Sequence, residues 1–285
     1  MSTPDNYSTE ILREWKESAA FWRDHYPSIR TMFAPVTNAL IEEAGIIEGN
    51  VVLDVAGGSG EPSLTIAELV GPRGSVTCTD AVADMVEAAK AEAERRGLRN
   101  MEFRQCLADS LPFEQDAFDV TVCRLAVMLF PDVPAALNEM MRVTKSGGTL
   151  AFVVWGRNEA NPFGHTVTDV LSQYLEIPAA PPDAPGAFRF AEPGKLARIL
   201  TDAGAVEVRE RELNFHIEAP LSSEQFWEMR SHMSGTLRDK LASLPPEQAR
   251  QVGLDVQNAV QEFFPNGQMS FPAQMLMVSG KYAKD

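Results

Sequence analysis

Short apolar runs alternate with longer amphipathic segments through the middle of the chain. The apolar runs are Val51–Val55, Ser75–Thr79, Met101–Leu107, Phe118–Val127 and Thr149–Trp155. Runs of this length, bounded by glycine and other turn residues, predict buried strands. The segments between them, Leu64–Val70, Ala83–Arg96 and Asp132–Thr144, predict helices. Regular alternation of strands and helices predicts a doubly wound, mainly parallel α/β sheet with helices on both faces.

The flanking segments depart from this rhythm. Residues 9–44 read as helices interrupted by Pro27 and Pro35. After Trp155 come a predicted helix, a proline-rich loop, another helix, a strand, a second helical stretch and a last strand. Their predicted ranges are Thr166–Glu176, residues 178–186, Gly194–Ala203, Val206–Ile217, Ser222 to about Phe264, and Gln274–Tyr282. With the five strands before Trp155, these two predicted strands would make a seven-stranded sheet.

We therefore predict one elaborated domain over residues 1–285. It would comprise an N-terminal helical lid (1–48), a core (49–156), an insertion (157–193) and the last strands (194–285). The final part would carry a helical insertion at about 222–264. A long loop within a compact chain is usually a functional cover or a disordered strip.

Charge and cysteine content narrow the class of protein. The formal net charge of −15 disfavours nucleic acid and anionic membranes as partners. The three cysteines, Cys78, Cys106 and Cys123, fall in predicted strands without metal-type or paired spacing, so we expect reduced thiols. The polar N-terminus and the shortness of the apolar runs predict no signal peptide and no membrane insertion, hence a cytoplasmic protein. A homodimer is left open.

The strongest chemical signal is the run from Val51 to Gly60, VVLDVAGGSG, in which a strand enters a glycine-rich turn. Pro62 is the expected first residue of the next helix. Glycines let a ligand approach the backbone, and free N–H groups at a helix start favour an anion. By itself such a turn is also compatible with a tight strand-to-helix connection that binds nothing.

Acidic residues at successive strand ends strengthen the signal. Asp54 closes the first strand, Asp80 closes the second about 20 residues after the glycine turn, and Asp109 follows the third. Carboxyl ends of parallel strands share one edge of the sheet. A carboxylate from the second strand can accept both ribose hydroxyls there, and one from the third can accept an adenine amine. The spacing suits a nucleoside lying across the sheet.

Four ordered motifs resemble the class I, UbiE-like S-adenosylmethionine (SAM)-dependent methyltransferases. They are LDVAGGSG, TDAVADMVEAAK, CLADSLPF and FDVTVCRLAVMLFPD, and AGAVEV and MLMVSGKY resemble the last strands of that family. The resemblance implies a Rossmann-like fold, SAM as cofactor and S-adenosylhomocysteine (SAH) as product. The cofactor-binding residues that it implies are Asp54, Ala56, Gly58, Gly60, Asp80, Ala81, Met85, Ala108, Asp109, Cys123, Arg124 and Leu125.

Within that pattern the glycine turn holds the methionine part, Asp80 the ribose, and Asp109 with Ala108 the adenine. Ala56 replaces the family's first glycine, which we expect to be a small change provided that its φ is negative. Arg124 holds the methionine carboxylate, holds a substrate anion, or pairs with an acid. Met85 is either an adenine neighbour or a plain core residue.

A dinucleotide site is the main rival for the glycine turn. Its fingerprint requires a third glycine, and Ser63 stands at that position. Aminopropyl transfer would need an acidic motif after the fourth strand, where RLAVMLF is apolar. A SAM-binding regulatory protein without turnover remains the alternative to an enzyme.

Catalytic residues are harder to identify from the sequence than cofactor-binding ones. Methyl transfer depends mainly on alignment, and a general base helps some acceptors. Of four histidines, His165 and His25 lie in expected covers and are the weak candidates for that base. No cluster has metal-ligand spacing, so we expect no metal.

The expected acceptor is a small, apolar or aromatic molecule. Its pocket would be lined by side chains of the covers, although helix packing alone would also explain some of them. These side chains are Trp15, Trp22, Phe163, His165, Phe226, Trp227 and Met229.

Overall fold

The computed structural model describes residues 4–178, 180–181 and 183–284. Its centre is a seven-stranded sheet of order β3-β2-β1-β4-β5-β7-β6, in which β7 runs antiparallel to its neighbours β5 and β6. The strands are β1 (Val51–Asp54), β2 (Ser75–Asp80), β3 (Met101–Gln105), β4 (Phe118–Arg124), β5 (Thr144–Trp155), β6 (Ala205–Ala219) and β7 (Met269–Tyr282). The predicted doubly wound, mainly parallel sheet is confirmed.

Alternating side chains bury both faces of this sheet. Val52, Val122 and Val153 pack toward α3 (Ala34–Ala44) and α4 (Ser63–Val70). Leu53, Cys123 and their neighbours pack toward α6 (Val133–Val143) and α8 (Lys195–Asp202) on the other face. Since successive residues of a strand point to opposite faces, strands covered on both sides are apolar throughout. This explains why continuous apolar runs located them in the sequence.

Several boundaries differ from the prediction for local reasons. Pro62 is the residue before α4, not its first residue. The helix after Trp155, α7 (Pro162–Leu171), starts earlier than predicted because Pro162 is suited to the first helical turn. It also ends earlier than predicted. Asp132 lies outside α6, where its carboxylate accepts from the Ala135 N–H at 2.9 Å. β3 stops at Gln105, so Cys106 and Leu107 follow the strand rather than belong to it.

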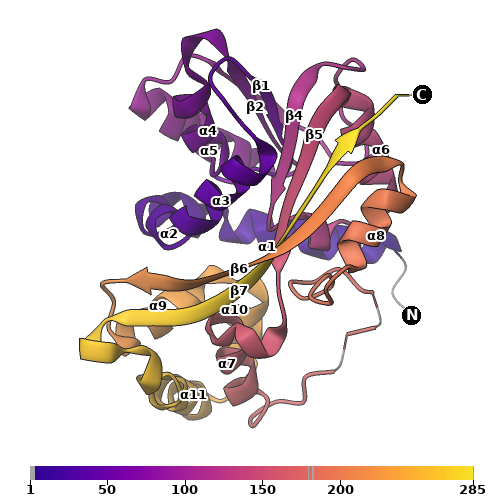
Figure 1. Ribbon diagram of the computed structural model, residues 1–285. Helices are drawn as coiled ribbons and strands as arrows, with labels where there is room; N and C mark the ends of the chain where they lie inside the picture. Colours follow the sequence, from indigo (N-terminus) through magenta and orange to yellow (C-terminus); the bar gives the residue numbers. More distant parts are fainter. Residues whose placement is uncertain (1–3, 179, 182, 285) are drawn as a thin grey trace.

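The largest difference is the length of β7, which begins at Met269 rather than at the predicted Gln274, whereas β6 was predicted to within two residues at each end. β5 pairs with β7 only as far as Trp155 and Met275, whereas β6 and β7 stay paired to Ala219 and Met269. The two strands therefore leave the sheet together as a two-stranded arm (Figure 1). Helices α7, α9 (Ser223–Met233), α10 (Gly235–Ala242) and α11 (Pro246–Ala259) gather around this arm, and α7 and α11 pack together.

The N-terminal helices bridge the sheet and the arm. α1 (Pro4–Asp24) packs against α5 (Ala83–Arg96) of the core and against α9 and α10 of the arm. It lies across the middle of the molecule, between the core helices and the α9–α10 pair (Figure 1). α2 (Tyr26–Met32) and α3 continue from it onto the sheet. The predicted helical character of residues 9–44 is confirmed, and residues 1–3, 179 and 182 of the expected covers lie outside the described residues.

Candidate functional site

The glycine turn after β1 has an unusual backbone. Ala56 has φ +58°, Gly58 φ +56° and Gly60 φ +116°. The expectation of a negative φ at Ala56 is therefore wrong: the turn requires the left-handed region at this position even though the residue carries a Cβ. The Gly57 N–H donates to the Thr79 carbonyl at 2.8 Å, which holds the turn against the end of β2. Strain at non-glycine residues often accumulates at binding sites.

Replacing Ala56 by glycine should stabilise the fold. An alanine in the left-handed region costs about 1–2 kcal/mol, and the greater entropy of glycine in the unfolded chain offsets about 0.4–1 kcal/mol of that gain. We expect Ala56→Gly to raise the free energy of unfolding by up to about 1 kcal/mol in urea titrations. Gly58→Ala is the matched control, since its added Cβ would meet nothing within 4 Å. It should be destabilising. A destabilised Ala56→Gly variant would contradict the strain assignment.

Asp54 is buried beneath this turn with one carboxylate oxygen unpartnered. The Ser63 hydroxyl donates to Oδ2 at 2.5 Å, whereas Oδ1 is buried and has no hydrogen-bond partner. Burial raises the pKa of Asp54 to about 7, although the Ser63 hydrogen bond and the charge of Arg124 oppose the shift. A buried acceptor without a donor is costly unless a ligand supplies the donor.

Asp80 ties the end of β2 to the glycine turn. Its Oδ2 accepts from the Gly58 N–H at 3.0 Å and its Oδ1 from the Val82 N–H at 2.9 Å. Burial raises the pKa of this carboxyl group, and the hydrogen bonds from backbone N–H groups work against that rise. Met85, at the start of α5, is buried with Val82 against Ala19 of α1.

The remaining predicted cofactor residues follow the ends of β2, β3 and β4. Ala81 comes directly after Asp80, while Ala108 and the exposed Asp109 lie in the loop beyond β3. Cys123 is buried near the end of β4, and Leu125 has φ +57°, a second strained non-glycine position. The fold thus places the residues of all four motifs at the carboxyl ends of neighbouring parallel strands, where open α/β sheets bind their ligands.

Arg124 belongs to a polar network that the sequence did not reveal. Its Nη1 donates to the Thr37 hydroxyl at 2.9 Å and its Nη2 to the Glu61 carbonyl at 3.0 Å. Within the described residues no carboxylate lies within 4 Å of its guanidinium, so it does not pair with an acid. The buried Glu61 side chain accepts from the Tyr26 hydroxyl, and Arg96 donates to that hydroxyl at 2.7 Å.

This network connects α2 and α3 to the glycine turn through Glu61. Burial, together with the negative charge of Glu61, raises the pKa of Tyr26, so the phenol stays protonated and acts as a donor. Its members are far apart in the sequence, and no local pattern indicated the network.

Comparisons with known proteins identify this arrangement. A family model described as a methyltransferase domain matches residues 46–204. Nocamycin O-methyltransferase of Saccharothrix syringae is 31% identical over 199 residues, which cover 66% of this chain and 70% of that protein. The chain belongs to the class I SAM-dependent methyltransferases.

A further relative aligns over a shorter part of the chain, and a solved structure shares the fold. An uncharacterized protein of Mycobacterium tuberculosis, Rv1405c, is 35% identical over 138 residues, 48% of this chain and 49% of that protein. The aligned part is thus about half the length of such curated relatives. The crystal structure of YcgJ from Bacillus subtilis has a TM-score of 0.55 at 21% identity, and the match covers 87% of this chain and 98% of that one. This last similarity concerns the fold. SAM is the cofactor of the family.

The predicted apolar pocket side chains lie on the covers of the methyltransferase and pack in two apolar clusters. Trp15 and Trp22 of α1 lie with ring centroids 5.6 Å apart and pack against Met85. Phe163 of α7 and Phe226 of α9 are buried with centroids 5.7 Å apart. These two rings belong to the same apolar cluster as Met229, and Trp22 and Leu125 pack against it. Trp227 also packs against this cluster and lies close to Gly253 of α11.

The two candidate histidines lie on the covers of the methyltransferase with partners on their own helices. His165 contacts the Asp169 carboxylate through Nδ1 at 2.7 Å and lines a hollow with Asn214 and His216 of β6. His25 is exposed, with its Nδ1 3.0 Å from the Phe21 carbonyl and its ring stacked on Phe21. These contacts do not connect either histidine to Asp54 or Arg124.

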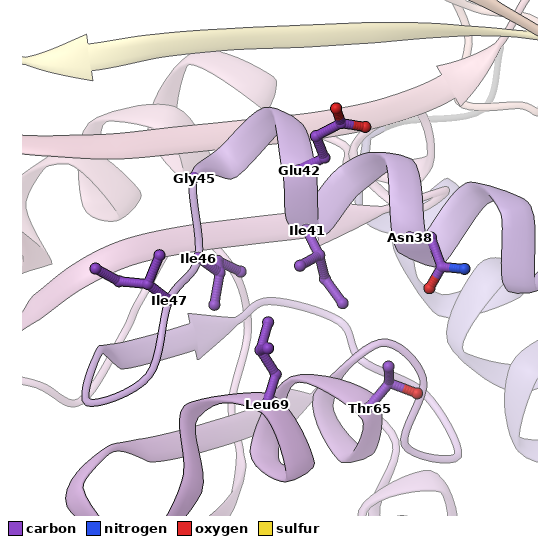
Figure 2. Close-up of a pocket in the computed structure, with 8 residues that line it drawn as sticks. All are labelled: Asn38, Ile41, Glu42, Gly45, Ile46, Ile47, Thr65 and Leu69. Carbon is purple, nitrogen blue, oxygen red and sulfur yellow. The ribbon is translucent and has the colours of Figure 1, made fainter.

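A shallow apolar depression lies elsewhere on the methyltransferase. It is formed by α3, the loop after it and α4, and its lining includes Ile47; Ile41, Ile46 and Leu69 point toward one another across it (Figure 2). None of the predicted cofactor residues lines it. Across the described residues, no group of three or more His, Cys, Asp or Glu side chains is placed to hold a metal ion. No helix within those residues is long and apolar enough to cross a membrane.

Proposed function

We propose that this methyltransferase transfers the methyl group of SAM to a small, apolar or aromatic acceptor. The observation that carries the proposal is the aromatic cover: Phe163 and Phe226 belong to the apolar core, and both Trp22 of α1 and Leu125, which follows β4 at the ligand edge of the sheet, pack against that core. The net charge of −15 argues against a nucleic acid acceptor. Relatives named as a nocamycin O-methyltransferase and a demethylmenaquinone methyltransferase support a small-molecule acceptor.

The site residues fit the cofactor in their donor and acceptor chemistry. Asp54 Oδ1 lacks a donor, and the ammonium of the methionine part would supply one. Asp80 would accept from the ribose hydroxyls, and Asp109 with Ala108 and Ala81 would border the adenine beside Met85. The turn from Ala56 through Gly58 to Gly60, with Cys123 and Leu125, would enclose the methionine part. Arg124 would face the methionine carboxylate or an acceptor anion.

The protein's contribution to the reaction is alignment. When bound, the cofactor supplies an activated methyl group; the acceptor's electron pair forms the new bond to carbon as the carbon–sulfur bond breaks and its electrons go to sulfur. Cover residues would hold the acceptor in line and exclude water, which is the main requirement of a displacement on an already activated centre. His165 and His25 remain the weak candidates for removing a proton from the acceptor.

Transfer from methyl-labelled SAM into a metabolite extract tests this function. We expect label to appear in a small organic product, and mass spectrometry of that product or of a copurifying ligand would identify the acceptor. Tight SAH binding without any labelled product across extracts would favour the alternative, a SAM-binding regulatory or interaction protein.

Cofactor affinity should depend on pH through Asp54. Burial raises the pKa of Asp54 to about 7, above its value in the unfolded chain. In the ligand-free protein the raised pKa therefore contributes to the free energy of unfolding at low pH, and this contribution is lost as the pH rises through 7. A cofactor ammonium favours the ionised form, so binding below that pH must first remove a proton. Calorimetry should show SAH affinity rising up to about tenfold per pH unit between about pH 5 and 7, then levelling.

Asp54→Asn separates this effect from other titrations. The amide cannot ionise, so the variant should bind SAH weakly and with much less dependence on pH. Asp80, whose pKa burial also raises, remains intact in this variant and serves as the internal comparison. An unchanged pH slope in Asp54→Asn would assign the titration to another group.

A further inference from the structure

Arg230 on α9 is a cation without a counter-charge in the cover of the proposed acceptor pocket. Its guanidinium lies over the Phe163 ring, with its carbon 4.9 Å from the ring centroid, and its Nη1 is 3.1 Å from Met233 Sδ. Its Nε is buried and has no hydrogen-bond partner. Throughout the described residues, no carboxylate lies within 4 Å of its nitrogens.

Other partly buried arginines of the described residues have polar partners, and even Arg124, which lacks a carboxylate within 4 Å, donates to the Thr37 hydroxyl and the Glu61 carbonyl. Arg96 is within 4 Å of Glu61, Glu68 and Glu92, and Arg142 makes a 2.7 Å ion pair with Glu139. For Arg230, burial lowers the pKa to about 10, and no neighbouring charge opposes this shift. Arg230 is only partly exposed, and burying its Nε without an acceptor or a carboxylate nearby is costly, so the position needs an explanation.

Arg230 borders apolar side chains of the covers. Phe163 belongs to the apolar cluster that contains Phe226 and Met229, and Trp22 and Leu125 pack against that cluster. Two further donors on α1, which packs against α9, are also buried without partners: the Ser18 hydroxyl and the Trp22 Nε1–H. Unpartnered donors on two helices that pack together, beside apolar side chains, suit a molecule that has an aromatic or aliphatic body and an oxygen-rich end.

We propose that Arg230 binds an anionic oxygen of the methyl acceptor, which is therefore an apolar or aromatic acid. Carboxylate and phosphate oxygens both match the guanidinium, and the Phe163 ring keeps its plane fixed for that contact. Ser18 and Trp22 supply neutral donors from the facing helix. The proposal rests on the proposed function, because it identifies the acceptor class of the same pocket.

Matched aromatic probes test the charge preference. The protein, saturated with SAH, is titrated with 1-naphthoate, 1-naphthyl phosphate and the neutral 1-naphthamide, and binding is followed by tryptophan fluorescence. We expect the better of the two anions to bind at least about tenfold more tightly than the amide, the scale of one charge-assisted contact. The preferred anion distinguishes a carboxylate acceptor from a phosphate acceptor. Equal binding of amide and anions would overturn the proposal.

Variants assign the preference to Arg230. Arg230→Met should abolish it, and Arg230→Lys should retain part of it. Arg238→Met is the matched control, since Arg238 donates to the His232 and Glu17 carbonyls on the same cover and should leave the preference intact. An Arg230→Met variant that still prefers anions would refute the assignment.

A ligand-free measurement decides the matter even if no naphthyl probe binds. Removing a partly buried cation that lacks a counter-charge should raise the melting temperature of the apo protein, so Arg230→Met should melt higher than the wild type. A purely structural role over Phe163 predicts a lower melting temperature, and that result would overturn the proposal. Failure of the wild type to bind SAH would instead contradict the proposed function.

Discussion

Asp80→Ala should weaken SAH binding by about 1.5–3 kcal/mol, or roughly 10- to 150-fold, the scale for losing charge-assisted hydrogen bonds in a shielded site. Two losses combine in this variant. The ribose would lose its acceptor, and the Gly58 and Val82 N–H groups would lose the carboxylate that holds the glycine turn to β2. Calorimetry with SAH measures the change directly.

Two further variants make this result interpretable. Asp80→Asn keeps one acceptor oxygen and should bind with an intermediate affinity. Asp84→Ala, at an exposed position of the first turn of α5, should bind SAH as the wild type does. Unchanged affinity in a folded Asp80→Ala protein would refute the assignment of the ribose site.

Deleting residues 1–24 should leave a folded sheet but reduce turnover by about 100-fold or more, the effect of losing alignment and water exclusion. The deletion removes α1, whose Trp15, Ala19 and Trp22 pack on Val82 and Met85 just beyond Asp80. It keeps Tyr26 and its contact with Glu61. We therefore expect unchanged strand content by circular dichroism, faster SAH dissociation and little product from the acceptor found in extracts.

The lid interpretation also makes a spectroscopic claim. Trp15 and Trp22 fluorescence should change on adding SAH to the full-length protein, and Trp22→Phe should diminish that change. Lys16→Ala, on the exposed side of α1, is the control and should behave as the wild type. Normal turnover by the truncated protein would show that α1 serves packing or oligomer contacts instead.

The order of the elements was predictable because buried parallel strands are apolar on both faces. Val51–Val55 is an example: its residues face two different helical layers, and glycine residues mark its ends. The acids at the strand ends were predictable for a related reason. A carboxylate at the carboxyl end of a parallel strand, such as that of Asp80, must lie at the ligand edge of the sheet.

Features that depend on distant pairs were not predictable in this way. The long β6–β7 arm was missed because Met269–Ala273 contains Pro272 and makes no pairs with β5. The left-handed conformation of Ala56 follows from the path of the whole turn rather than from its own residue type. Tyr26 and Glu61 meet across 35 positions, and no local pattern indicates such a contact.

A crystal structure of the full chain with SAH tests the central claim most directly. The account predicts SAH beyond the carboxyl ends of β1, β2 and β4 and beneath α1. Its ribose hydroxyls should lie on Asp80 and its ammonium on Asp54 Oδ1. Density for SAH at another place, such as the depression between α3 and α4, with the Asp80 carboxylate bonded only to Gly58 and Val82, would contradict it.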